Sequence, residues 1–159
     1  MGSTEAARSA SAKPLLSHAI SSRLNLGLVI PAHPLALTAS KRMNERRQRA
    51  LSRYYIAAGA GGLAVGVHTT QFQIRDPEIG LFKPVLEIAA EEMNRADRAR
   101  RDPLVRIGGI CGPLRQAVAE ATLLRELGYH AGLLNLGALP DATEDELIAH
   151  CSAVGAELP

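Results

Sequence analysis

The sequence has no tryptophan, and only three tyrosines and two phenylalanines among its 159 residues. Large aromatic side chains therefore cannot dominate a core, and the hydrophobic 47% of the chain must build one mainly from Ala, Leu, Val and Ile. Two cysteines, Cys111 and Cys151, are too few for a disulfide framework. Because unpaired thiols are typical of reducing compartments, we expect a cytoplasmic protein.

Long apolar runs are also missing. No stretch approaches the roughly 20 apolar residues of a membrane-spanning helix, and the N-terminus lacks the apolar core of a signal peptide. The net charge of +2 does not predict nucleic-acid binding, because acidic residues lie among the arginines of the charged runs 42–53 and 95–101. We therefore expect neither membrane nor nucleic-acid partners. Residues 1–23 are expected to form a flexible N-terminal segment and lead-in.

What the chain does contain is a fourfold repeat of a short apolar run followed by an amphipathic segment. The apolar runs predict strands buried on both faces, at 24–30, 62–67, 104–110 and 130–136. The amphipathic segments predict helices at 44–58, from 76, at 113–127 and from 143. The apolar stripe of the first of these helices includes Tyr54 and Tyr55, which we expect in the core.

Several boundary residues support these helices. Asp76, Pro77 and Glu78 together favour a helix start, because Asp caps, Pro suits the first helical position and Glu favours the positive end of the helix dipole. Thr143 and Glu146 have the spacing of a capping box. The last helix is therefore predicted with its first residue next to Thr143.

Four strand–helix units in strict alternation predict an α/β fold with an all-parallel sheet. No G-x-G-x-x-G follows the first predicted strand, which disfavours a dinucleotide-binding sheet. A TIM (β/α)8-type barrel typically needs about 250 residues, so residues 24–159 are predicted to be its first four βα units, a half barrel that stops before strand five. Residues 157–159 are expected to be the approach to that strand. Bare parallel edges favour a homo-oligomer.

Residues 27–32 (GLVIPA) and 55–65 (YIAAGAGGLAV) form a strand and a helix-to-strand turn of recognisable type, and the later Arg106-Ile-Gly-Gly and Leu127-Gly-Tyr-His-Ala-Gly have matching spacing. Together they resemble the dihydrodipicolinate synthase / N-acetylneuraminate lyase family. The resemblance covers roughly residues 24 to 159, which correspond to the first half of the family's barrel.

The resemblance implies a class I aldolase or lyase that acts on a pyruvate-type oxo acid through a lysine Schiff base, without a cofactor. It places the Schiff-base lysine on the sixth strand and a catalytic tyrosine on the fifth, so both are expected beyond Pro159. The lysines present, Lys13, Lys41 and Lys83, match neither position. We therefore expect no catalytic residue here, and Thr69 with Thr70 to hold the carboxylate of the oxo acid.

The chain departs from the family at that very place. A Gly-Thr-Thr-Gly-Glu signature is replaced by His68, the two threonines, Gln71 and Phe72, and residues 136–140 (LGALP) stand where many members carry Tyr-Tyr-Asn-x-Pro. These departures leave a different substrate or another reaction open.

Further site candidates follow the predicted strands, where barrel enzymes carry their sites. The residues that we expect to contact substrate are Thr69, Thr70, His68, Asn135 and His33. His33, His68 and Cys111 have side chains that suit zinc, but their spacing matches no compact zinc motif, so no metal site is predicted.

Three functions remain open at this stage. The first is an aldolase or lyase half that is inactive in Schiff-base chemistry by itself. The second is a metal-dependent barrel isomerase or epimerase. The third is a non-catalytic half-barrel oligomer. Each predicts a different result. The first predicts no covalent adduct when the chain is treated with pyruvate and borohydride, the second predicts stoichiometric zinc or manganese, and the third predicts an oligomer and not a stable monomer.

Overall fold

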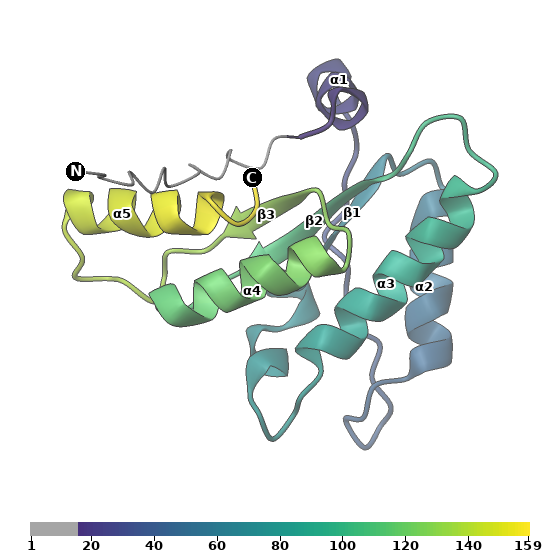
Figure 1. The fold of residues 1–159 in the computed structure, drawn as a ribbon. Helices are drawn as coiled ribbons and strands as arrows, with labels where there is room; N and C mark the ends of the chain where they lie inside the picture. The colour runs from purple at the N-terminus through teal and green to yellow at the C-terminus, as the bar shows by residue number, and fades with distance from the viewer. Residues whose placement is uncertain (1–15) are drawn as a thin grey trace, which may run out of the picture.

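A computed structural model of the protein describes residues 16–159 (Figure 1). Most of the predicted flexible segment lies outside these residues, but its last part is helical. The elements in chain order are α1 (His18–Leu26), α2 (Glu45–Ala57), β1 (Gly62–Val65), the 3-10 helices η1 (His68–Thr70) and η2 (Phe72–Arg75), α3 (Phe82–Asp97), β2 (Val105–Ile110), α4 (Leu114–Glu126), β3 (Ala131–Leu134) and α5 (Glu144–Gly155).

The three strands form a parallel sheet in the order β1-β2-β3. Helix α3 packs against β1, and α4 packs against β2 and β3. In Figure 1, α2 pairs with α3 beside one end of this layer and α5 lies along α4 at the other. The prediction of an α/β fold with a parallel sheet is confirmed. Among residues 16–159 no helix is both long and apolar enough to cross a membrane.

The first predicted strand is wrong in its bounds. Residues 24–26 end α1, and Gly27 follows with φ of 83°. The next residues run beside β1 but form only one parallel bridge, between Ala32 and Ala64. The His33 N–H donates to the Ala64 carbonyl at 2.8 Å, whereas Pro31 has no N–H to extend the ladder. The first unit therefore lacks a regular strand.

The second predicted helix begins later than expected. Asp76 does cap a turn, since its carboxylate accepts from the Glu78 N–H at 2.9 Å. Its carbonyl accepts from the Gly80 N–H at 2.8 Å, and Gly80 has φ of 58°, which no right-handed helix continues through. Helix α3 begins only at Phe82. The capping box at Thr143 and Glu146, by contrast, is confirmed at the start of α5.

Residues 157–159, expected to approach a fifth strand, return to the sheet after α5 without forming a strand themselves. The Gly132 N–H of β3 donates to the Pro159 carbonyl at 2.8 Å, and the Leu158 side chain is buried in the core. Pro159 therefore lies beside β3, where a further parallel strand would pair. The expectation that the Schiff-base lysine and the catalytic tyrosine lie beyond Pro159 stays a prediction.

The core lies between the sheet and helices α3 and α4, and aliphatic side chains fill it. Leu63 and Val65 of β1 pack with Leu86 and Met93 of α3, all fully buried. The one large aromatic side chain in the cluster of buried residues, Tyr129, donates its hydroxyl to the Leu86 carbonyl at 3.0 Å. The prediction that aliphatic residues build the core is confirmed.

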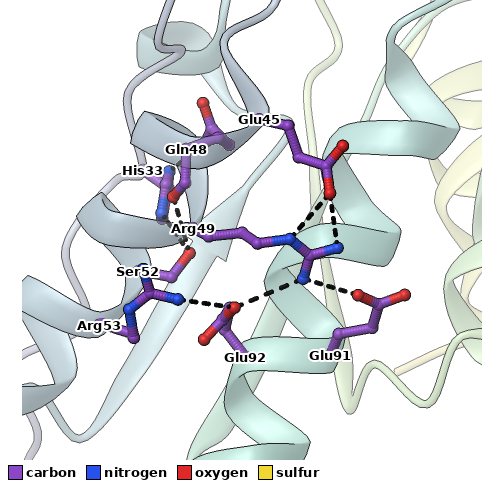
Figure 2. Close-up of polar contacts among 8 residues, drawn as sticks. All are labelled: His33, Glu45, Gln48, Arg49, Ser52, Arg53, Glu91 and Glu92. Atoms are coloured by element: carbon purple, nitrogen blue, oxygen red, sulfur yellow. Dashed lines mark hydrogen bonds and ion pairs between the residues drawn. The ribbon is translucent and has the colours of Figure 1, made fainter.

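Ion pairs join α2 to α3 on the outside of the layer (Figure 2). Arg49 contacts Glu91 at 2.7 Å, and Arg53 contacts Glu92 at 3.1 Å. The hydrogen bond from Arg49 to Glu91 and that to Glu45 raise the pKa of Arg49 above its ordinary value. Since the two arginines are partly exposed and Glu92 is buried, the arginines neutralise a carboxylate that water cannot reach.

Candidate functional site

The carboxyl ends of the three strands surround a cavity of about 120 Å³. Its lining residues are Val67, His68, Phe72, Gly109, Ile110, Leu133, Leu134 and Asn135. The structure thus brings together two of the predicted site residues, His68 and Asn135, from loops that are separated by more than sixty residues of sequence. We refer to this cavity as the strand-end cavity.

The two threonines lie on η1, next to the strand-end cavity. Thr70 is fully buried; its hydroxyl donates to the His33 carbonyl at 2.6 Å and accepts from the Gly66 N–H at 3.1 Å. The Thr69 hydroxyl is half-buried and donates to the same carbonyl over a longer 3.4 Å. Thr70 therefore fixes the loop in place, and Thr69 keeps the more available hydroxyl.

Asn135 follows β3 and is exposed. Its side-chain oxygen accepts from the Gly137 N–H at 2.7 Å, which orients the amide. The amide nitrogen has no partner among residues 16–159, so it remains available as a donor. His68, at the start of η1, is exposed as well. Both side chains are therefore accessible to a small polar ligand.

His33 is not brought to this cavity. Its ring is fully buried and points toward α2, where Nε2 lies 2.9 Å from the Ser52 hydroxyl and Nδ1 lies 2.9 Å from the Gln48 amide nitrogen (Figure 2). Both ring nitrogens therefore have partners within the protein, and only the His33 carbonyl reaches the threonines. The structure thus gives the side chain buried partners on α2, and the substrate contact expected from the sequence stays a prediction.

The buried polar group around His33 also corrects the predicted core face of α2. Gln48 and Ser52 are its buried residues, whereas Tyr54 is 67% exposed. Tyr55 is half-buried and meets the His33 ring edge to face, with ring centres 5.9 Å apart. The helix is thus anchored by hydrogen bonds to the loop that precedes it as well as by apolar contact.

Lowering the pH is expected to destabilise the fold through His33. Burial lowers its pKa below the ordinary value of 6.5, so as the pH falls through that value the unfolded chain binds the proton more readily than the folded chain does. The free energy of unfolding should therefore fall as the pH is lowered through this value. Urea titrations followed by circular dichroism measure this slope. His33→Asn should flatten it, whereas exposed His18→Gln should not; equal slopes for His33→Asn and the wild type would contradict the assignment.

Sequence reasoning missed a buried ion pair beneath the strand-end cavity. The Arg75 Nε donates to both carboxylate oxygens of Glu120, at 2.9 and 3.0 Å, and both side chains are only 8% exposed. A signal was present, because Glu120 lies on the helical stripe of Ala117, Ala121 and Leu124, where a carboxylate requires a buried partner. The sequence did not indicate which arginine that partner would be.

The pair continues into the loop after β2. Glu120 accepts from the Cys111 N–H at 3.1 Å and from the Gln116 amide at 2.8 Å. Burial raises the pKa of the Cys111 thiol, and the charge of Arg75 only partly opposes this. A thiol with a raised pKa is largely protonated near neutral pH, which disfavours a nucleophilic role for Cys111.

The three residues considered for zinc do not converge. His33 is buried against α2, while His68 lines the strand-end cavity and Cys111 lies beside Glu120. Within the described residues 16–159, no three His, Cys, Asp or Glu side chains lie close enough together to hold a metal ion.

Comparisons by sequence give no result, since no protein-family model and no curated protein matches the chain. Comparison of structures gives many. N-acetylneuraminate lyase from Fusobacterium nucleatum superposes with a TM-score of 0.69 at 21% identity, covering 82% of this chain and 42% of that one. A prophage protein of the dihydrodipicolinic acid synthase family from E. coli K12, solved in complex with pyruvate, gives the same four values.

Dihydrodipicolinate synthase from Oceanobacillus iheyensis reaches a TM-score of 0.70 at 12% identity, over 82% of this chain and 41% of its own length. These neighbours carry the names of the dihydrodipicolinate synthase and N-acetylneuraminate lyase family, so the predicted resemblance is confirmed at the level of the fold. The chain spans less than half the length of the solved structures that it matches.

Proposed function

We propose that the chain is the first half of the (β/α)8 barrel of a dihydrodipicolinate-synthase-like aldolase or lyase, and that it holds the oxo-acid end of the substrate. The observation that carries this proposal is the strand-end cavity, which His68 and Asn135 both line and which Thr69 adjoins as the next residue of η1. Sites of barrel enzymes lie at this face. The pyruvate complex of one structural neighbour supports a small oxo acid as the ligand.

Each polar group has a role in this proposal. The Thr69 hydroxyl exchanges its long 3.4 Å bond to the His33 carbonyl for one to the carboxylate, and the Asn135 amide nitrogen donates to the carboxylate as well. His68 lines the same cavity, where it can donate to the same anion or move a proton. Lysine attack on the oxo group would form the Schiff base in the full-length enzyme. Lys83 is 62% exposed, pairs with Glu87 on α3 and does not line the cavity, so the amine is proposed to come from beyond Pro159.

Pyruvate is expected to bind this chain without a covalent bond, and Thr69→Val should weaken binding about tenfold, because one donor to the carboxylate is lost. Thr69→Ser keeps the hydroxyl and serves as the matched control, with near wild-type affinity. Ligand-observed NMR titration measures both. Equal affinity of the wild type and Thr69→Val would remove Thr69 from the proposed site.

Borohydride reduction in the presence of pyruvate tests the covalent step separately. Since the proposal places the Schiff-base lysine outside residues 1–159, mass spectrometry should find the unmodified chain. An adduct of reduced pyruvate on Lys13, Lys41 or Lys83 would show that this chain supplies the amine itself.

A non-catalytic oligomer is a second candidate, and exposed apolar side chains favour it. Val29, whose carbonyl accepts from the Gly61 N–H beside β1, is 74% exposed, and Leu133 within β3 is 56% exposed. A second copy or further barrel strands would cover such residues. Light scattering distinguishes a defined oligomer from a monomer. The free thiols Cys111 and Cys151 support a reducing, cytoplasmic location for either candidate.

A further inference from the structure

We propose that Arg75 and Glu120 are positioning residues that set the shape of the strand-end cavity by clamping the ends of β1 and β2. This inference rests on the proposed function for the identity of the ligand, but its geometric part can be tested without any ligand. The argument depends on where the clamp attaches, what it encloses and why an ion pair is used.

The clamp attaches at the point where the sheet ladder ends. The last paired residues of β1 and β2 are Val65 and Gly108. Immediately beyond them, the carbonyls of Gly66 and Gly109 both accept from Arg75 Nη2, at 3.0 and 2.9 Å. Beyond the last backbone pairing of β1 and β2, one planar guanidinium group therefore bonds to both chains and fixes the distance between them.

Arg75 also closes the loop that carries the candidate ligand contacts. Because it bonds back to Gly66, the segment 66–75 becomes a ring that contains His68, Thr69 and Phe72. The guanidinium carbon lies 4.2 Å from the centre of the Phe82 ring at the start of α3 and 5.8 Å from that of Phe72. Cation–π contact thus orients Phe72, which is itself part of the cavity wall.

Glu120 extends the clamp to the second loop. Its carboxylate holds Arg75 on one side and accepts from the Cys111 N–H on the other. The loops after β1 and β2 are consequently fixed to one another through two side chains. The candidate contacts on the first loop and Gly109 near the end of β2 then keep a constant separation.

Stability alone is a weak reason for this pair. Arg75 Nη1 is buried and has no hydrogen-bond partner among residues 16–159. Replacement of a buried ion pair by apolar side chains of similar volume is often neutral or stabilising, whereas loss of one partner leaves a buried charge. A charged pair with an unsatisfied donor therefore indicates a geometric requirement that apolar packing cannot meet, namely hydrogen bonds to two strand-end carbonyls.

The test is the double variant Arg75→Met/Glu120→Met, which removes both charges and keeps the volume. It should unfold at a temperature close to that of the wild type, yet bind pyruvate at least about tenfold more weakly by NMR titration. Amide exchange should accelerate at Cys111 and Thr70, and stay unchanged at Ala64 within β1. The single variant Arg75→Met should be much less stable than the wild type, because it leaves the Glu120 carboxylate buried without its partner. Its loss of stability therefore measures the cost of a buried charge and not the positioning role.

A second buried pair provides the matched control. Arg106 and Asp97 lie at the opposite end of β2, 2.6 Å apart and 11% and 19% exposed. Arg106→Met/Asp97→Leu also removes an ion pair between an arginine and a carboxylate, but away from the cavity, so the affinity for pyruvate should not change. If the Arg75/Glu120 double variant folds, binds pyruvate like the wild type and keeps its Cys111 and Thr70 protection, the inference is overturned.

The two proposals fail in different ways. If the wild type binds no pyruvate but the double variant still loses protection at Cys111 and Thr70, the proposed function is wrong and the clamp stands. If the wild type binds pyruvate and the double variant retains both affinity and protection, the clamp is wrong and the proposed function stands.

Discussion

Gly109→Ala is expected to destabilise the fold by about 3 kcal/mol or more, because the space for a Cβ atom is already occupied by backbone. A Cβ at this position would lie 2.3 Å from the Gly66 carbonyl oxygen and 2.9 Å from the Val67 nitrogen. Neither atom can move without separating the ends of β1 and β2, where Arg75 holds both chains. Thermal and urea unfolding measure the loss.

The matched control is the same substitution in α5. Gly155 has no atom within 4 Å of its Cβ position, and Gly155→Ala should be neutral or stabilise by up to about 0.5 kcal/mol, since Ala has the higher helix propensity. A small effect of Gly109→Ala, similar to that of Gly155→Ala, would show that the two strand ends can separate freely. It would also remove the basis for a fixed cavity.

The sequence predicted those elements whose signals are local. The capping residues of α5 lie within one turn of its start, and the residues that begin and end α2 and α4 stand next to those helices in the sequence. The first strand failed for a long-range reason. Its apolar run is suitable for a strand, but Pro31 has no N–H to donate to β1. The loss of this hydrogen bond can be recognised only when the neighbouring strand is known.

The sequence predicts where the candidate residues lie along the strands, but not where each of their side chains points. His68 and Asn135 line one cavity because parallel strands end at one edge of the sheet, and this rule can be applied to the sequence alone. The side-chain direction of His33 depends on the single bridge between Ala32 and Ala64, and the ring turns to Gln48 on α2 instead. Composition and spacing cannot supply that direction.

The Arg75–Glu120 clamp shows why the rest could not be predicted. Its two side chains lie 45 positions apart and meet across the sheet edge. Glu120 alone indicates that a cation must come to α4, but several arginines of this chain would satisfy a carboxylate equally well. The choice depends on the turn at Asp76–Gly80, which delays α3 and keeps Arg75 beside the strand ends.

Leu124→Ala should cost about 2–5 kcal/mol, the range for truncating a fully buried leucine. Leu124 packs onto Gly108, where a Cβ would lie 2.1 Å from its Cδ2 atom. The glycine thus leaves a hollow in β2 that the leucine fills, and alanine would leave it empty. Leu133→Ala, at a side chain that is 56% exposed in β3, is the matched control and should cost below about 1 kcal/mol.

A double-mutant cycle isolates this contact from general core loss. Gly108→Ala alone should destabilise, because the new methyl group meets Leu124, whereas in Gly108→Ala/Leu124→Ala the methyl group occupies part of the vacated space. The double variant should therefore be more stable than the sum of the two single losses, by about 1 kcal/mol or more. Strict additivity in urea unfolding would mean that α4 packs on β2 without this interlock. In that case the register of Glu120, and with it the clamp on the strand ends, would have to be fixed by the remaining contacts of α4.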